Sequence, residues 1–235
     1  MLIFAHRGAS ADAPENTLAA IKLALAQNVD GIEIDVHQLD QELVVIHDRW
    51  VHRTTNGKGQ LSQYSMLQLR TLDAGLGEKV PTLWEVMQLI AGQCTLNIEV
   101  KGLKDVALVL ALINKAQTEL GFKHEQFIVS SFDHHLLAQI KQLQPDLKIG
   151  ALTASKPIDY ALFASTLGAY SVNTDITFLD QAFVNDAHQR GLKVFVYTVD
   201  EPEDLAMLYH WGVDGIFCNG PALAKAFVSS ISSGR

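Results

Sequence analysis

The chain has 235 residues, of which 48% are hydrophobic and 19% are charged, and its formal net charge is -8. This composition is typical of a soluble globular protein, and the length is close to the roughly 250 residues of a β/α barrel. The negative charge argues against a general nucleic-acid binder or a protein held on anionic membranes, since both need a basic surface.

Short apolar runs alternate along the chain with helical patterns, which is typical of a parallel sheet with crossover helices. In chain order, strands are expected at residues 2–5, 31–36, 95–100, 126–130, 148–152, 169–173, 193–197 and 213–217. Helices are expected at residues 15–27, 82–91, 104–120, 133–143, 157–166, 179–190, 201–210 and 221–229. Eight such pairs are the number in a closed TIM (β/α)8 barrel, which is the predicted α/β fold.

Several predicted helix boundaries carry capping signals. Thr82 and Glu85 have the spacing of a capping box, and Pro202 and Pro221 fit the first turn of a helix. Gly212 directly follows a helical stretch, as is common at helix C-termini.

One additional strand breaks the regular alternation. Residues 43–46 follow strand 31–36 after about six residues, which are too few for a crossover helix, so an antiparallel hairpin is expected. Facing residues in a hairpin share one side of the sheet. We therefore expect His47 to pair with Glu33 or Asp35.

A second irregular segment covers about residues 49–80. It is rich in glycine, asparagine and threonine, and it has one helical stretch near residues 65–72. We interpret it as an insertion after the hairpin that covers the mouth of the barrel. Residues 1–235 are accordingly expected to form a single domain.

Charged side chains gather where the predicted strands end. They are His6 and Arg7, Glu33 and Asp35, His47 and Asp48, and Glu99 and Lys101. In a parallel barrel the carboxyl ends of different strands converge on one mouth, and residues there are typically catalytic.

The acidic residues predict a metal site. Glu33 and Asp35 are two positions apart on a strand and so project to one face, where buried carboxylates repel unless a cation joins them. With Glu99 from another strand they form an all-oxygen site suited to Mg²⁺ or Ca²⁺. The alternative is that these acids only form buried ion pairs with Arg7 and Lys101, but such pairs stabilise weakly and seldom gather at strand ends without function.

His6 and His47 add two imidazoles that can titrate near neutral pH. One can deprotonate a nucleophile while the other protonates a leaving oxygen, each effect being worth ~10²- to 10⁴-fold. The Arg7 guanidinium and the Lys101 ammonium suit phosphate oxygens. Together with a metal, these groups predict phosphodiester hydrolysis of a small molecule.

Two alternatives from other classes remain open. Lys101 could be the Schiff-base lysine of an aldolase, although the neighbouring Glu99 argues against this role because a carboxylate favours the charged ammonium. The other alternative is a barrel that binds a phosphorylated ligand without catalysis, which the presence of both histidines makes less favourable.

Motifs spread over nearly the whole chain have the order and spacing of one known family. They are His6-Arg7-Gly8, Pro14-Glu15-Asn16-Thr17, Glu33-x-Asp35, His47-Asp48, Arg53-Thr54-Thr55, Glu99-x-Lys101, Ser131-Phe132-Asp133, Val196-Tyr197-Thr198-Val199 and Trp211-Gly212-Val213-Asp214-Gly215-Ile216. Together these motifs closely resemble the glycerophosphodiester phosphodiesterases of the bacterial, cytoplasmic type.

The resemblance implies a β/α barrel with a small insertion and one divalent cation, Mg²⁺ or Ca²⁺. It implies hydrolysis of glycerophosphodiesters, such as glycerophosphocholine and glycerophosphoethanolamine, to sn-glycerol 3-phosphate and an alcohol. The implied roles are metal ligands for Glu33, Asp35 and Glu99, general acid and base for His6 and His47, and phosphate binding for Arg7 and Lys101. Which histidine is the acid stays open, as does the nucleophile, either water or the glycerol 2-hydroxyl.

Further substrate contacts are expected from aromatic residues and one amide. Phe132, Tyr197 and Trp211 are candidates to flank the glycerol or alcohol group, although aromatic residues at such positions belong to the core about as often. Asn16 is expected either to orient a phosphate oxygen or water, or to cap the helix at residues 15–27. The alternative substrate is a lysophospholipid, which would require an apolar groove or membrane-facing surface.

Three features depart from the family pattern. The hairpin turn at residues 39–42 lacks the Asp-Gly expected of the family and is about one residue shorter. Asp200 stands where asparagine is common, and Cys218-Asn219 stands where Thr-Asp is common. We expect Asp200 and Cys218-Asn219 at the far rim of the site, with an effect on substrate choice.

The compartment is predicted from the N-terminus and the cysteines. The apolar stretch at residues 2–5 is interrupted by His6 and Arg7, too early for the ~7 to 15 apolar residues of a signal peptide. Cys94 and Cys218 match neither a zinc-ligand spacing nor a disulfide framework, so free thiols are expected. These features predict a cytoplasmic protein without stable membrane association, and a homodimer stays open.

Overall fold

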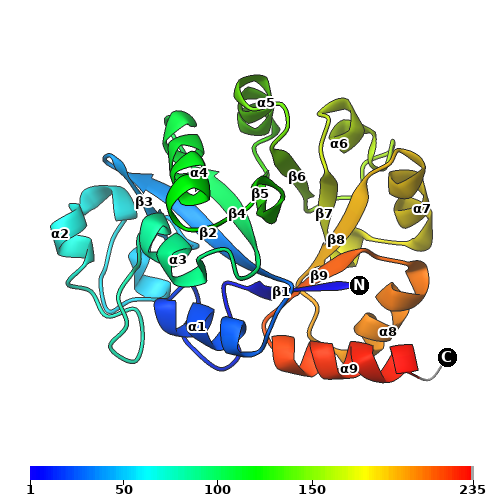
Figure 1. The fold of residues 1–235 in the computed structure, drawn as a ribbon, viewed down its shortest axis with the longest axis horizontal. Helices are drawn as coiled ribbons and strands as arrows, with labels where there is room; N and C mark the ends of the chain where they lie inside the picture. The colour runs from blue at the N-terminus through cyan, green and yellow to red at the C-terminus, as the bar shows by residue number, and fades with distance from the viewer. Residues whose placement is uncertain (234–235) are drawn as a thin grey trace.

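The computed structural model describes residues 1–233, and within them eight parallel strands close into a barrel ringed by helices (Figure 1). The barrel strands are β1 (Leu2–His6), β2 (Gly31–Leu39), β4 (Thr95–Gly102), β5 (Phe127–Ser131), β6 (Lys148–Thr153), β7 (Ser171–Asp175), β8 (Lys193–Tyr197) and β9 (Gly215–Cys218). Strand β1 pairs with both β9 and β2, which closes the ring. The predicted TIM barrel is therefore confirmed, with boundaries shifted by one to three residues at some strand ends.

Helices cover the outside of the barrel. They are α1 (Leu18–Ala26), α2 (Met66–Leu69), α3 (Leu83–Ile90), α4 (Ala107–Glu119), α5 (His134–Leu143), α6 (Leu162–Thr166), α7 (Gln181–Gln189), α8 (Pro202–Trp211) and α9 (Pro221–Ser233). Short 3₁₀ turns lie at η1 (Val51–Arg53), η2 (Leu61–Gln63), η3 (His124–Gln126) and η4 (Ile176–Phe178). Across the described residues, every helix is too short or too polar to cross a membrane.

The capping signals explain where several helices begin and end. The Thr82 side chain accepts a hydrogen bond from the Glu85 backbone N–H, and the Glu85 carboxylate accepts one from the Thr82 N–H at 2.8 Å, which confirms the capping box. Helix α8 ends at Gly212, whose φ of 78° is the left-handed conformation favoured by glycine. Helix α6 begins five residues later than expected, at Leu162, because Pro157 initiates a turn that Tyr160 N–H closes.

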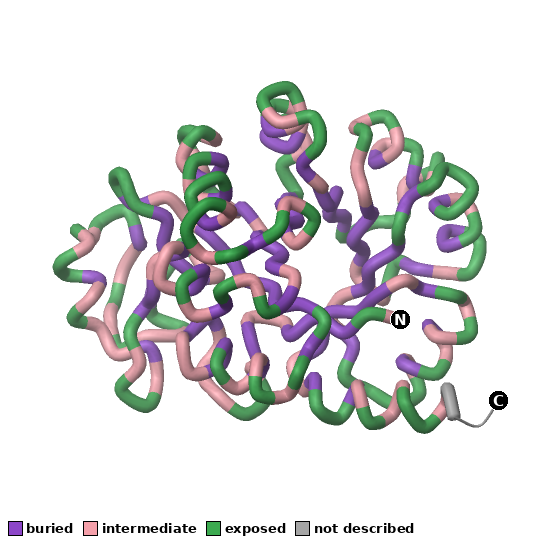
Figure 2. The backbone as a smooth tube through the Cα atoms, in the orientation of Figure 1, coloured by how far each residue is buried: buried purple, intermediate pink, exposed green. Residues whose placement is uncertain are grey.

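Two separate hydrophobic regions hold the barrel together. The larger one lies between the strands and the surrounding helices. Figure 2 shows that the strands are mostly buried and that the helices around them are more exposed. The smaller one fills the barrel interior with Phe4, Ile128, Phe195 and Phe217, each at most 3% exposed. The Phe4 ring lies 5.3 Å from Phe195 and 5.2 Å from Phe217 between centroids. These rings form an apolar layer inside the barrel.

Gly31 is the position on β2 that makes room for Phe4. A methyl group there would lie 2.3 Å from the Phe4 ring. We expect Gly31→Ala to lower the free energy of unfolding by about 1–3 kcal/mol, because the ring must leave its packed position. Chemical denaturation measures this loss, with Gly220→Ala as the control since its methyl group meets the nearest atom only at 3.9 Å. Equal stability of the two variants would contradict the expectation.

The early hairpin is confirmed, but its predicted register is wrong. Strand β3 (Glu42–Val45) pairs antiparallel with the end of β2, with Val45 opposite Val36. Ile46 N–H donates to the Asp35 carbonyl at 3.0 Å, so Ile46 and not His47 lies opposite Asp35. Strand β3 ends at Val45, so the alternation of side chains along a strand does not apply to His47. The backbone bends after the strand, and this bend brings the His47 side chain to 4.0 Å from Asp35.

The segment after the hairpin, which contains α2, packs on β3 at one side of the barrel (Figure 1). Its buried side chains join those of the hairpin in a small hydrophobic cluster. The cluster consists of Leu39, Val44, Ile46, Val51, Leu61, Leu69, Ala74 and Val80. The expected helical stretch at residues 65–72 is shorter, because α2 spans Met66–Leu69.

Candidate active site

A cavity of about 160 Å³ opens at the carboxyl ends of the barrel strands. Most of the site residues expected from the sequence line it. They are His6, Arg7, Glu33, His47, Glu99, Lys101, Phe132 and Tyr197. Asp35 lies against these groups with 1% exposure, and the mouth of the barrel therefore gathers the predicted chemistry in one place.

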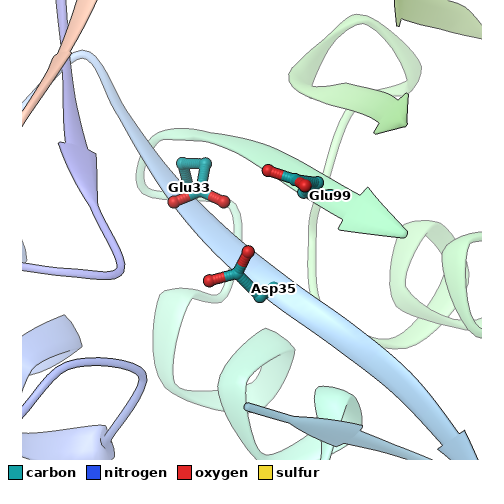
Figure 3. Close-up of side chains that lie close together, drawn as sticks. All are labelled: Glu33, Asp35 and Glu99. Atoms are coloured by element: carbon teal, nitrogen blue, oxygen red, sulfur yellow. The ribbon is translucent and has the colours of Figure 1, made fainter. Parts of the chain in front are cut away.

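Three carboxylates converge at this mouth (Figure 3). Glu33 and Asp35 come from β2, and Glu99 comes from β4, where it lies opposite Asp35 in the register of the sheet. One oxygen of each carboxylate lies within 4.8 Å of the others. This spacing is compatible with a single hard cation bound by carboxylate oxygens.

Two cations flank the acidic cluster. Arg7 Nε lies 3.1 Å from Asp35 Oδ2, and Lys101 Nζ lies 3.2 Å from Asp35 Oδ1 and 2.5 Å from Glu99 Oε1. Burial alone would raise the pKa of Asp35, but Lys101 and Arg7 outweigh burial and lower it. Asp35 is consequently the member of the cluster that stays ionised most readily.

Glu33 has the opposite electrostatic situation. Burial, and then the charges of Asp35 and Glu99, raise the pKa of Glu33 well above its usual value. Arg7 N–H donates to Glu33 Oε2 at 3.0 Å, whereas Oε1 is buried without a hydrogen-bond partner in residues 1–233. A buried carboxylate oxygen of this kind lacks a positive partner, so the residues present fit a bound cation.

The two histidines are held by different neighbours. His6 Nδ1 lies 2.8 Å from the Asn219 amide oxygen, and His47 Nδ1 lies 2.6 Å from Asp48 Oδ1. Burial and then the Arg7 charge lower the pKa of His6. His47 Nε2 points toward the acidic cluster, 4.0 Å from an oxygen of Asp35.

Asn16 supports Asp35 and does not cap the following helix. Its amide nitrogen donates to Asp35 Oδ2 at 2.9 Å, and its amide oxygen accepts from Asp35 N–H at 3.3 Å. The cap of α1 is Thr17. Asn16 adopts a φ of 57°, a left-handed conformation that asparagine tolerates, and this turn directs its side chain to β2.

The three aromatic candidates lie in different places. Phe132 and Tyr197 line the cavity as an edge-to-face pair with centroids 6.2 Å apart, and the Phe132 ring lies 5.9 Å from Lys101 Nζ. Tyr197 also donates from its hydroxyl to the Thr153 carbonyl at 2.9 Å, which fixes the ring. Trp211 is the last residue of α8 and is not among the residues lining the cavity.

An ionic chain links the insertion to the site. Arg53 pairs with Asp48 through Nε and with Glu15 through both terminal nitrogens at 2.8 Å, and Glu15 pairs with Arg7 at 2.9 Å. Partial burial alone would raise the pKa of Asp48, but hydrogen bonds from Arg53 and then His47 lower it to about 2. The sequence showed these residues as motif members without indicating that they contact one another.

Asn219 is also closer to the chemistry than the sequence indicated. Asn219 follows β9 directly and contacts His6, so its expected place at the far rim is wrong. The rule that led to the other candidates, a polar residue at a strand end, applies equally to Asn219.

The carboxyl mouth of the closed barrel carries three acids, two imidazoles and two cations. This combination defines an enzyme that acts on phosphate esters and has a candidate site for a divalent metal. Residues 6–223 match the model of the glycerophosphoryl diester phosphodiesterase family. The chain belongs to this family, which confirms the enzyme class expected from the sequence.

Individual relatives agree over nearly the full length. The chain is 39% identical over 230 residues to a glycerophosphodiester phosphodiesterase of Caldanaerobacter subterraneus subsp. tengcongensis, covering 94% of each chain. It is 32% identical to a glycerophosphodiester phosphodiesterase of Bacillus subtilis, over 95% of this chain and 85% of the relative. It is also similar, with a TM-score of 0.89 and 28% identity over 97% of each chain, to a solved phosphodiesterase of Oleispira antarctica in complex with the product sn-glycerol-3-phosphate.

Proposed function

We propose that this enzyme hydrolyses glycerophosphodiesters to sn-glycerol 3-phosphate and an alcohol. The observation that carries the proposal is the convergence of Glu33, Asp35 and Glu99 with Arg7 and Lys101 around one cavity. The similar Oleispira antarctica phosphodiesterase, whose structure contains sn-glycerol-3-phosphate, supports this choice of product.

Glu33, Asp35 and Glu99 are the proposed ligands of one divalent cation, and oxygen-only ligands favour Mg²⁺ or Ca²⁺. When bound, such a cation polarises a phosphoryl oxygen and lowers the pKa of an attacking oxygen. Fully ionised, the three acids exceed the two cations Arg7 and Lys101 by one negative charge. A divalent cation reverses that sign and makes the site attractive to an anionic phosphodiester.

The surrounding residues have separate proposed roles in substrate binding and proton transfer. Arg7 and Lys101 are proposed to hold phosphoryl oxygens, because both are charged donors at the cavity wall. His6 and His47 are proposed to exchange protons with the nucleophile and the leaving alcohol. Phe132 and Tyr197 supply apolar surface for the organic part of the substrate. Asn16 orients Asp35.

The ionisation of Lys101 argues against the Schiff-base alternative. Despite its burial, the charges of Asp35 and Glu99 raise the pKa of Lys101, so the amine stays protonated near neutral pH. A Schiff-base lysine needs the opposite shift.

Metal removal tests the proposal directly. We expect chelator-treated protein to release glycerol 3-phosphate from glycerophosphocholine at least about 10³-fold more slowly, because metal charge stabilisation is worth several kcal/mol. Added Mg²⁺ or Ca²⁺ should restore the rate in the wild type but not in Glu99→Gln. Asp186→Asn is the control, since Asp186 pairs with Arg190 on the outer helix α7 and should respond like the wild type. Full activity in excess chelator would refute the metal site.

Two further expectations concern the whole molecule. The buried free thiols of Cys94 and Cys218 support the proposal of a reducing, cytoplasmic compartment. The packing of Val51, Leu61 and Leu69 against the hairpin supports the proposal that residues 1–235 form a single domain.

A further inference from the structure

A chain of hydrogen bonds runs from Asp200 through Asn219 to His6. The Asn219 amide nitrogen donates to Asp200 Oδ2 at 2.6 Å, and the amide oxygen lies 2.8 Å from His6 Nδ1. Asp200 Oδ1 accepts from the backbone N–H groups of Asn219 and Gly220 at 2.7 and 3.2 Å. Ser10 Oγ donates to the same amide oxygen at 2.9 Å. Both the nitrogen and the oxygen of the Asn219 amide therefore have hydrogen-bond partners.

These contacts determine which nitrogen of His6 carries the hydrogen. An ionised carboxylate only accepts hydrogen bonds, so the Asn219 nitrogen must face Asp200 and the oxygen must face His6. An amide oxygen also only accepts, so His6 Nδ1 must be the donor. In neutral His6 the lone pair is therefore on Nε2, the ring nitrogen that Asn219 leaves free.

His47 has a different partner at the same ring position. Its Nδ1 faces the Asp48 carboxylate, which is itself paired with Arg53. The neutral Asn219 amide therefore fixes the orientation of the His6 ring, and the Asp48 carboxylate fixes that of the His47 ring. With Nε2 of His6 assigned as the proton acceptor, His47 is the imidazole left to supply a proton.

We propose that Asn219 and Asp200 are positioning residues that hold neutral His6 with its hydrogen on Nδ1, so that His6 Nε2 takes the proton of the nucleophile and His47 donates the proton to the departing alcohol. This assignment rests on the proposed phosphodiesterase function. The position of His6 in the cavity wall and its burial support the assignment, since both favour a neutral imidazole next to the reacting groups.

The proton balance of the displacement is simple. The nucleophile's oxygen forms a bond to phosphorus while its proton passes to Nε2 of His6. The bond between phosphorus and the alcohol oxygen breaks, and that oxygen takes a proton from His47. His6 ends as imidazolium and His47 as neutral imidazole, and exchange of one proton each with solvent restores the starting states.

Two variants separate positioning from general structural support. Asn219→Leu removes the amide at similar volume, and we expect kcat to fall about 10- to 100-fold with KM nearly unchanged. The exchange variant, Asn219→Asp combined with Asp200→Asn, keeps every hydrogen bond but turns a carboxylate toward His6. Its kcat should be close to that of the wild type and well above that of Asn219→Leu. The acidic limb of its kcat/KM profile should lie about 1–3 pH units above that of the wild type, because a carboxylate stabilises the protonated imidazole of His6. The other charged groups that face His6 are unchanged in both variants: Arg7, Asp35 and Glu15.

Nitrogen NMR of isotope-labelled histidine reads the tautomer without requiring activity, with His6→Gln to assign the signal. We expect protonated Nδ1 and unprotonated Nε2 at neutral pH in the wild type, and loss of this preference in Asn219→Leu. Asn185→Leu and Asp204→Asn, on the outer helices α7 and α8, are the matched controls and should leave the tautomer and the pH profile unchanged.

The outcomes are distinguishable from failure of the proposed function. A neutral His6 that carries its hydrogen on Nε2 would overturn the positioning role, as would an exchange variant whose pH profile matches the wild type. The expected tautomer in a protein that hydrolyses no glycerophosphodiester would uphold the positioning of His6 and refute the proposed reaction.

Discussion

Glu33→Gln is expected to abolish activity while stabilising the metal-free protein. Activity should fall at least about 10³-fold, because a cation ligand is lost from a site whose charge stabilisation is worth several kcal/mol. The free energy of unfolding in chelator should rise by about 1–2 kcal/mol, since replacing a buried, poorly compensated charge is often stabilising. In the wild type the backbone N–H of Arg7 donates to Glu33 Oε2. The amide oxygen of glutamine can accept the same hydrogen bond, so the local structure should be retained.

The pH dependence of this stabilisation identifies its cause. The folded-state pKa of Glu33 is raised above that of the unfolded chain, by burial first and then by Asp35 and Glu99. Below the unfolded value of about 4.3, the group is protonated in both states and the wild type pays no ionisation cost. As the pH rises from about 4 through the folded pKa, the wild type loses stability relative to Glu33→Gln. The advantage of the variant should therefore grow over this range and then level off.

Denaturant unfolding in chelator, measured across this pH range, tests the expectation. Glu85→Gln is the matched control, because Glu85 is a compensated carboxylate in the capping box of α3 and pairs with Arg70. That variant should lose stability and keep its activity. If Glu33→Gln were also less stable than the wild type at the upper end of this pH range, the electrostatic account of the cluster would be wrong.

His47→Gln is expected to lose activity in a way that depends on the leaving group. With glycerophosphocholine, kcat should fall about 10²- to 10⁴-fold, because choline leaves as a poor alkoxide unless it is protonated. With a nitrophenyl ester of glycerol phosphate, the loss should be less than about tenfold, since the phenolate is stable without a proton. Steady-state rates on both substrates measure the difference.

Two further variants make this comparison specific. His6→Gln should lose activity on both esters, because a base is needed whichever group departs. His52→Gln is the control, since the His52 ring lies tilted against Trp50 in the insertion, with centroids 6.0 Å apart, and does not line the cavity. Equal losses of His47→Gln on the two esters would exclude His47 as the proton donor.

The predictable part of the structure follows from local rules. Alternating strands and helices indicate the barrel, and Glu33 and Asp35 share a face because side chains on a strand repeat every two residues. Convergence of strand ends places Glu99 beside them. These relations depend on periodicity and topology, both of which are visible in one sequence.

The contacts that the sequence did not predict involve side chains that lie outside the regular strands and helices. His47 lies beyond the end of β3, so its approach to Asp35 depends on a bend and not on strand register. Asn16 reaches Asp35 from a left-handed turn. The contact of Asn219 with His6 closes the ring between the last strand and the first, 213 residues apart in the chain. The place of Asn219 at a strand end is visible in the sequence, but its partner His6 is not, because the contact depends on how the ring of strands closes.

The aromatic layer inside the barrel has a consequence for the order of events in turnover. Within residues 1–233, Phe4, Phe195 and Phe217 pack together inside the barrel, so we expect substrate and products to pass through the same opening at its mouth. The alcohol is uncharged at the reacting oxygen and can depart first. We expect glycerol 3-phosphate, a dianion that faces Arg7 and Lys101, to leave after the alcohol, so that its release limits how soon the next substrate enters.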